Sequence, residues 1–388
     1  MGIKKIAFIV FVVVMVLLAC DRGENYDYEY SQPQAFDDGI ETASLESVGM
    51  ATGPIRAMMD YINGVEMHRI HDILILKNDR LVFEEYFPGY AFIWNSPGSD
   101  GEWMEYTRET DHFMASVSKS VTSVVAGCAV KEGLLPNLNR TVLDCFPEYG
   151  DVLVGQKAAI TLYHLITMTS GLAFDENTYP YGDPRNDISA MFAAADPIRY
   201  VLERPLTSTP GSQFFYNSGT TNVLAAEVAR AAGMNFLDYA NLRLFNPMNT
   251  QGGVWHVFPS GDTFASGGLF LRPRELAKIG LLFLNDGLWQ GEQIVTPDWI
   301  NRSQQQHVAT SGFPADFGYG YGYLWWIRDF AGGGTNYRCY FAAGWGDQYM
   351  FIIPALDMII VFNCGNYQVN ARISPFDLVE EYILEALN

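Results

Sequence analysis

The most informative stretch of the sequence is Ser116-Val117-Ser118-Lys119, an S-x-x-K pattern at the start of a helix predicted over residues 115–133. Three positions on a helix place the serine and the lysine on one face, within reach of each other. A serine hydroxyl becomes a useful nucleophile when a neighbour accepts its proton. The pattern therefore predicts Ser116 as a nucleophile and Lys119 as its proton-transfer partner. Taken alone, it also fits a helix-capping serine followed by a solvated lysine.

A second candidate element follows later in the chain, at Phe215-Tyr216-Asn217-Ser218-Gly219. A tyrosine beside a serine–lysine pair can act as general base and then as general acid, provided that a lysine ammonium lowers its pKa. We therefore predict that Tyr216 is catalytic and that Ser218 contacts substrate, although Tyr216 could instead be a core tyrosine. His164 could suggest a serine–histidine–aspartate triad, but Lys119 and Tyr216 already fill the proton-transfer roles.

A third element is the run 340–348, which contains Gly344-Trp345-Gly346 and joins two predicted strands. Glycines allow a backbone to approach a substrate closely. We expect the amide of Trp345 to complete an oxyanion hole with the amide of Ser116. Gly344 and Gly346 would then lie beside the substrate, although the run also suits a tight hairpin turn. Two further candidates for substrate binding lie in the polar loop 175–187, namely Tyr179 and Tyr181.

Strand-like segments lie at both ends of the chain, and the middle is mostly helical. An Asn-Asp turn separates the runs 71–77 and 80–86, which predicts a hairpin. Further strands are expected at 321–327, 337–343, 348–353 and 358–363, and helices at 55–62, 274–285 and 375–387. The pattern predicts an α+β fold, in which N- and C-terminal segments build one antiparallel sheet flanked by helices. A mostly helical lobe, at about 115–265, would be inserted into it.

Residues 1–20 have the pattern of an export signal. Lys4 and Lys5 precede an apolar run that is too short for a usual membrane span, and the stretch ends at Ala19-Cys20. This ending resembles the lipobox of bacterial lipoproteins, so we expect a lipidated Cys20, a membrane anchor and a location in the periplasm or at the cell exterior. Residues 21–43 would form an acidic tether to one domain over 44–388. An ordinary signal peptide is the alternative.

Composition narrows the range of partners. The 388 residues carry a formal net charge of −20, which argues against a nucleic-acid partner because phosphate backbones would be repelled. The histidines show no zinc-ligand spacing, and the predicted chemistry needs no metal or cofactor. In an exported protein the remaining cysteines could form disulfides or stay as buried thiols; they are Cys128, Cys145, Cys339 and Cys364.

From about residue 44 to residue 387 the sequence resembles the serine β-lactamase and penicillin-binding-protein superfamily. The S-x-x-K motif matches at Ser116 and Lys119, and the Y-x-N motif matches in part at Tyr216. Flanking signatures at 160–172, 210–211 and 265–269 agree. The likeness is greatest to the branch of class C β-lactamases, carboxylesterases and 6-aminohexanoate-dimer hydrolases. It implies a β-lactamase/transpeptidase-like fold and an acyl-enzyme on Ser116, with an ester or amide of a small molecule or short peptide as substrate.

Two departures from the family pattern bear on the substrate. Ser218 stands where Y-x-N has its asparagine, and Ala342-Ala343-Gly344 replaces Lys-Thr-Gly or His-Thr-Gly. In β-lactamases that cation and hydroxyl help to hold the substrate carboxylate, a charge-assisted contact worth about 1.5–3 kcal/mol. We therefore expect an esterase or amidohydrolase. A β-lactamase or D-alanyl peptidase of the cell envelope, and a non-catalytic penicillin-binding-type sensor, are the alternatives.

Overall fold

The computed structural model describes residues 27–94, 100–251, 253–313, 317–367, 369 and 371–387. The expected signal peptide and Cys20 lie outside these ranges, so the lipoprotein stays a prediction. The first described residues, expected as part of a tether, lie against the folded domain. The amide of Tyr28 donates to Asp60, and the hydroxyl of Tyr30 donates to the carbonyl of Val82 at 2.9 Å.

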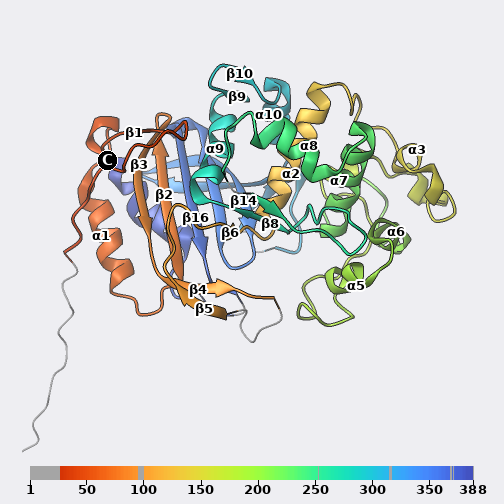
Figure 1. Ribbon diagram of the computed structural model, residues 1–388, viewed down its shortest axis with the longest axis horizontal. Coiled ribbons are helices and arrows are strands. Elements are labelled where there is room, and N and C mark those ends of the chain that lie inside the picture. The colour runs from red at the N-terminus through yellow and green to blue at the C-terminus, as the bar shows by residue number, and fades with distance from the viewer. Residues whose placement is uncertain are drawn as a thin grey trace, which may run out of the picture.

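Both ends of the chain build the central sheet, as expected (Figure 1). Within the described residues its nine strands run in the order β1-β3-β2-β16-β15-β14-β13-β12-β11. Neighbouring strands are antiparallel, except that β1 pairs in parallel with β3. The bounds are β1 (Glu41–Thr42), β2 (Ile70–Lys77), β3 (Arg80–Tyr86), β11 (Val308–Ala309), β12 (Gly320–Tyr321), β13 (Trp326–Gly332), β14 (Thr335–Gly344), β15 (Gln348–Ile353) and β16 (Met358–Cys364).

The N-terminal hairpin forms as its sequence predicts. Asn78 and Asp79 join β2 to β3, and both have positive φ, at 51° and 61°. Asparagine and aspartate tolerate this conformation, which two-residue hairpin turns require. On its other edge β2 pairs with β16, which joins the N-terminal hairpin to the C-terminal strands.

Two C-terminal predictions need correction. The strand expected at 321–327 is interrupted: Tyr321 ends β12, residues 322–325 form a turn with Leu324 at φ 63°, and β13 begins at Trp326. The apolar residues of the turn are buried by packing, as in the contact of Trp325 with Phe283 of α9 at 4.3 Å, so the continuous apolar run did not indicate a continuous strand. The last helix, expected over 375–387, is α11 (Pro375–Leu378) followed by a π-helical turn (Val379–Ile383) and a 3₁₀ turn (Glu385–Leu387).

The helices lie around the sheet and in the segment to its right in Figure 1, where α3, α5, α6, α7 and α8 gather. None in the described ranges is long and apolar enough to cross a membrane. Their bounds are α1 (Thr52–Asn63), α2 (Val117–Lys131), α3 (Val142–Cys145), α4 (Leu162–Ile166), α5 (Asp187–Ala193), α6 (Pro197–Glu203), α7 (Ser218–Ala232), α8 (Phe236–Ala240), α9 (Pro273–Leu284) and α10 (Pro297–Ser303). Small sheets add β4 (Gly89–Phe92), β5 (Asp100–Met104), β6 (His112–Phe113), β7 (Val254–Trp255), β8 (Leu269–Leu271), β9 (Leu288–Trp289) and β10 (Glu292–Gln293).

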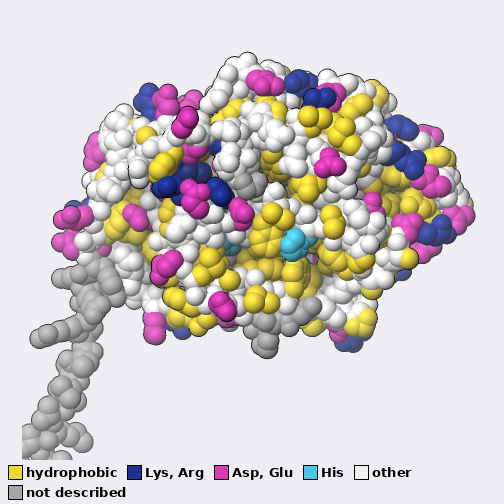
Figure 2. All heavy atoms as spheres, viewed as in Figure 1, with side chains coloured by type: hydrophobic (Ala, Val, Ile, Leu, Met, Phe, Trp, Pro, Cys, Tyr) yellow, Lys and Arg dark blue, Asp and Glu magenta, His cyan; other side chains and the backbone are white. Residues whose placement is uncertain are grey.

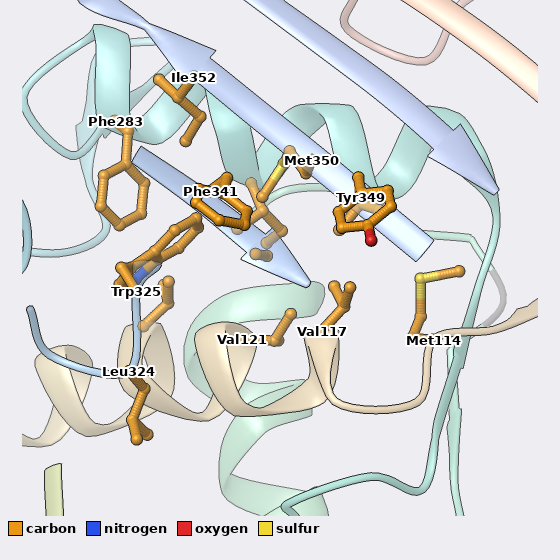
Figure 3. Close-up of a cluster of buried hydrophobic side chains, with 14 of the residues drawn as sticks. Met114, Val117, Val121, Phe283, Leu324, Trp325, Phe341, Tyr349, Met350 and Ile352 are labelled. Carbon is orange, nitrogen blue, oxygen red and sulfur yellow. The ribbon is translucent and has the colours of Figure 1, made fainter. Parts of the chain in front are cut away.

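Helix α2 is the central helix of the molecule. It contacts β14 and β15 of the sheet as well as α7, and every residue from Val117 to Ala129 is buried. Figure 3 shows Val117 and Val121 facing the strands that carry Phe341 and Met350. A helix that is buried on all sides anchors its own N-terminus firmly. The first turn of α2 is therefore held at the end of β14.

The cysteines within the described residues are buried and free. Burial raises the pKa of the thiols of Cys128 and Cys145 to about 12. A thiol with such a pKa is a poor nucleophile and a poor metal ligand, because the thiolate is the reactive form. The sequence left open whether these four cysteines form disulfides or stay as buried thiols, and in the structure they are buried thiols.

Candidate active site

Ser116 and Lys119 are in direct contact at the start of α2. The ammonium or amine Nζ of Lys119 donates to Oγ of Ser116 at 2.8 Å. Ser116 occupies the N-cap position, but its side chain makes no capping hydrogen bond in the described structure. Lys119 is only 2 % exposed. The capping serine and solvated lysine that the pattern also allowed are therefore both excluded by the geometry.

The turn before the nucleophile is strained and tightly held. Ala115 has φ 45°, a conformation that non-glycine residues rarely adopt and that is stored mainly at functional sites. The hydroxyl of Ser118 donates to the carbonyl of Ala115 at 2.6 Å and accepts from the amide of Leu269 at 3.1 Å. The second serine of the motif thus ties the turn to β8 and fixes the direction in which Ser116 points.

The environment of Lys119 favours its uncharged form. Its Nζ also donates to the carbonyl of Ser266 at 2.8 Å, so its nearest partners are a hydroxyl and a carbonyl. Burial lowers the pKa of Lys119 to about 8, although the nearby carboxylate of Glu176 acts in the opposite direction. A lysine with such a pKa is partly neutral at physiological pH and can accept a proton.

Tyr216 reaches the same nucleophile from the segment before α7. Its ring lies 4.9 Å from Nζ of Lys119, and Tyr216 and Ser116 line the same cavity. Burial raises the pKa of Tyr216 well above its ordinary value, and Glu176 adds to this rise. The condition for Tyr216 to act as a general base was a pKa lowered by a lysine ammonium, and the shift is in the opposite direction. Tyr216 is a neutral phenol here, and a neutral phenol is a proton donor.

Glu176 is a site residue that the sequence did not reveal. It is buried, and its Oε1 accepts a hydrogen bond from the amide of Ser218 at 3.3 Å. Burial raises the pKa of its carboxyl group, while Lys119 and Ser218 lower it. In the sequence it stands in an acidic, polar loop beside Asp175, and nothing local separates it from solvated neighbours. Only the fold turns this one carboxylate toward Ser116.

The turn between β14 and β15 closes the site from the sheet side. A Cβ atom at Gly344 would lie 2.4 Å from the carbonyl of Met114, so only glycine allows β14 to approach the nucleophile segment this closely. Gly346 has φ 84° and lies against the ring of Tyr367, which again requires glycine. Trp345, between them, lines the same cavity as Ser116.

Gln348 holds this turn in place from within. Its Nε2 donates to the carbonyls of Trp345 and Gly346 at 3.2 and 2.9 Å, and to that of Cys364 at 2.7 Å. Its Oε1 accepts from the amide of Cys364 at 3.1 Å. A buried amide that meets so many backbone groups fixes the turn geometry. The sequence placed Gln348 in the motif but gave it no function.

Most of the predicted site residues meet around one open cleft of about 430 Å³. Its described lining has two carboxylates, Glu176 and Asp347, and no lysine or arginine. Ser218 lines a smaller adjoining cavity together with Ser116. The predicted residues that line the open cleft are Ser116, Tyr181, Tyr216, Gly344, Trp345 and Gly346.

Two other residues considered from the sequence lie elsewhere. The ring of Tyr179 stacks on the guanidinium of Arg185 at 4.1 Å, and Tyr179 is absent from the described lining of the cavities at Ser116. His164 forms a reciprocal cap with Thr161 at the start of α4, with both hydrogen bonds at 3.3 Å. His164 is thus a structural residue, in agreement with the rejection of a triad.

A serine hydroxyl that accepts a hydrogen bond from a buried lysine, at the start of a helix packed on a sheet, is an arrangement suited to acyl transfer. The chain belongs to the Beta-lactamase family, whose model matches residues 55–364, and is a hydrolase of that family. It is 24 % identical over 305 residues to the 6-aminohexanoate-dimer hydrolase of Paenarthrobacter ureafaciens, covering 74 % of this chain and 70 % of that protein.

Solved structures agree on the fold. A family VIII carboxylesterase superposes with a TM-score of 0.62 at 14 % identity, covering 86 % of this chain and 98 % of that one. The octameric penicillin-binding protein homologue from Pyrococcus abyssi gives a TM-score of 0.61 at 19 % identity, covering 85 % and 76 %. These likenesses confirm the β-lactamase/transpeptidase-like fold, while membership of the class C branch stays a prediction.

Proposed function

We propose that this protein is a serine hydrolase that forms an acyl-enzyme on Ser116 and cleaves an ester or amide of a small molecule or short peptide. The hydrogen bond from the buried Lys119 to Oγ of Ser116 is the observation that carries this proposal. It joins a nucleophile to a base with a lowered pKa, which is the arrangement that nucleophilic catalysis by serine needs. The relative from Paenarthrobacter ureafaciens is named as a hydrolase of the 6-aminohexanoate dimer, which supports hydrolysis of a small molecule.

In the first step neutral Lys119 accepts the hydroxyl proton of Ser116 while Oγ bonds to the carbonyl carbon of the substrate. The carbonyl π electrons move to oxygen, and the amides of Ser116 and Trp345 stabilise the oxyanion. Each such donor is worth about 2.7–4 kcal/mol in the transition state. In support, Gly344 lies close to the segment before Ser116, and Ser116 and Trp345 line one cavity.

In the second step the bond from the carbonyl carbon to the leaving group breaks as the oxyanion collapses. The phenol of Tyr216 gives its proton to the leaving oxygen or nitrogen and is reprotonated by the ammonium of Lys119. The lysine is then neutral again, and it removes a proton from the water that attacks the acyl-enzyme. Returning that proton to Oγ of Ser116 releases the acid product and restores the enzyme.

The charged side chains that line the cleft favour substrates that are neutral or positively charged. Glu176 and Asp347 line it, while the family's cation and hydroxyl are replaced by Ala342 and Ala343. A substrate carboxylate would meet like charge and would lack a charge-assisted contact worth about 1.5–3 kcal/mol. We therefore rank esters and linear amides above β-lactams and peptide stems that end in a carboxylate.

Labelling and a substrate panel test this proposal. Wild type should give a fluorophosphonate adduct on Ser116 by mass spectrometry, and should hydrolyse p-nitrophenyl acetate or a linear amide dimer faster than a chromogenic cephalosporin. Ser116→Ala should lose both properties. Ser123→Ala is the matched control, because its hydroxyl is buried in the same helix without a hydrogen-bond partner in the described structure. A folded wild type that neither labels nor turns over any substrate would instead support the sensor, and faster cephalosporin turnover a β-lactamase.

We also propose that Cys20 is lipidated and holds the exported enzyme on a membrane. The support is the sequence pattern at residues 1–20, a positive start and an apolar run that ends in Ala19-Cys20. Cell fractionation of wild type and Cys20→Ala tests it. Wild type should sediment with membranes and the variant should be soluble, whereas a soluble wild type would contradict the anchor.

A further inference from the structure

A large apolar cavity lies next to the nucleophile and has no part in the chemistry described above. Its volume is about 670 Å³, within the range of small-molecule sites. Its described lining is mostly apolar and aromatic, and contains no Lys, Arg, Asp or Glu. The residues are Trp94, Tyr181, Gly182, Ile188, Ser189, Phe192, Trp255, His256 and Val257. In Figure 2 hydrophobic side chains surround a histidine near the middle of the face shown, in the region of β8 in Figure 1.

This cavity adjoins a small cavity of about 30 Å³ that contains Ser116. Trp94, Tyr181 and Ile188 line both the large cavity and the small one that contains Ser116 and Trp345. Their rings form a connected wall, because Trp94 meets Tyr181 edge to face at 5.7 Å and Tyr181 packs on Trp345 at 4.9 Å. The large cavity and the cavity at Ser116 are thus separated by no more than these shared side chains, and a substrate chain that reaches from Ser116 into the large cavity must pass along them.

The position of Tyr216 indicates which part of the substrate goes there. Tyr216 lines the open cleft, and it is absent from the described lining of both the small and the large cavity. In the proposed mechanism Tyr216 protonates the leaving group, so the leaving group lies in the open cleft. The acyl group must then lie on the other side of Ser116, where the apolar cavity begins.

We propose that the large cavity is an acyl-binding pocket for an extended apolar group, an alkyl chain or an aryl group without charge. The inference rests on the proposed function and adds the substrate class. A hydrophobic pocket gains about fourfold in kcat/KM for each methylene group that it buries, until the chain fills the available space. The open cleft on the leaving-group side carries two carboxylates, Glu176 and Asp347, among its aromatic residues, so we expect a smaller gain there.

Two ester series measured with the wild-type enzyme test this assignment. In the first the acyl group of p-nitrophenyl esters lengthens from acetate through butyrate to octanoate; in the second the alcohol of alkyl acetates lengthens from ethyl to octyl. After correction for alkaline hydrolysis, kcat/KM should rise by about tenfold or more along the acyl series. It should change less than about threefold along the alcohol series. Hydrolysis of the acetate with a flat or falling acyl series would overturn the pocket and leave the proposed function intact.

A pair of surface variants locates the effect. Val257 is 50 % exposed and lines the cavity, and Val254 is 54 % exposed in the same segment but lies outside its described lining. Val257→Asp places a charge on the pocket wall and should lower octanoate turnover about tenfold, with acetate unchanged. Val254→Asp should leave both rates unchanged. Equal effects of the two variants, or none from either, would overturn the assignment. Absence of both ester hydrolysis and fluorophosphonate labelling would instead contradict the proposed function itself.

Discussion

Two buried lysines, on two helices that pack against the same sheet, have opposite surroundings. Lys278 on α9 is fully buried, and its Nζ forms an ion pair with Glu275 at 2.7 Å and donates to the carbonyl of Asn249 at 3.0 Å. Lys119 on α2 is buried to nearly the same extent, but its hydrogen bonds go to the hydroxyl of Ser116 and one carbonyl, and the carboxylate of Glu176 acts on it without a direct ion pair. An ammonium paired with a carboxylate is stabilised as a charge, whereas one without such a partner is driven toward the neutral form. The same residue type is thus structural in one helix and suited to proton transfer in the other.

The largest difference should follow from replacing each lysine by methionine. Lys119→Met should lower kcat/KM by about 100- to 10,000-fold, because the base is lost. Lys278→Met should leave Glu275 buried without its partner and lower the free energy of unfolding by about 3–5 kcal/mol. The folded Lys278→Met enzyme should keep near-normal activity. Denaturant unfolding and ester hydrolysis measured on both variants check the pair, and an active Lys119→Met enzyme would break the comparison.

Tyr216→Phe should show which proton Tyr216 transfers. Removing a proton donor should lower turnover of an amide, a poor leaving group, by about 100-fold or more. A p-nitrophenyl ester should lose much less, because p-nitrophenolate leaves without protonation. In the double variant with Lys119→Met the loss on the amide should be well below the product of the single losses. Equal losses on amide and ester would mean that Tyr216 instead acts on Ser116.

Gln348→Leu should test the oxyanion turn apart from proton transfer. The variant loses the hydrogen bonds that fix the carbonyls of Trp345 and Gly346, so the amide of Trp345 should be less well placed. We expect kcat to fall by about tenfold with little change in the pH dependence. An altered pH profile would show that the turn also affects Lys119.

Glu176→Gln should produce the smallest change, a shift in pH dependence. The carboxylate of Glu176 raises the pKa of Lys119, so its removal lets burial lower that pKa further. The reaction needs neutral Lys119, so kcat/KM of the wild type should rise with pH through a midpoint near 8. In the variant this rise should occur at lower pH. A shift to higher pH would contradict the account of how Lys119 is tuned.

The sequence predicted the parts of the site that lie within short motifs. Ser116 and Lys119 are three positions apart on one helix, so local geometry alone brings them together. The hairpin at Asn78 and Asp79 could be predicted equally well, because the residues that favour its turn are adjacent in the sequence. These predictions depend on spacing, which a sequence displays directly.

The missed features depend on contacts between distant segments. Glu176 looks like any acid in a polar loop until the fold places its carboxylate next to Ser218 and Lys119. The pKa of Tyr216 is raised because the side chain is buried, and a sequence motif does not show whether a side chain is buried. The turn at Leu324 was missed for a related reason. Its apolar residues are buried by packing against other segments, as Trp325 is against Phe283, and not by strand pairing.

The central claim is that Lys119 is neutral when Ser116 attacks, and the titration of this one side chain tests it most directly. NMR of protein labelled with ¹³C at the lysine Cε, recorded from pH 6 to 11, follows every lysine separately, and Lys119→Met identifies the signal of Lys119. We predict that this signal titrates near pH 8, because burial lowers the pKa of Lys119 to about 8. A Lys119 signal that titrates at or above the ordinary lysine value, about 10.4, would contradict the account.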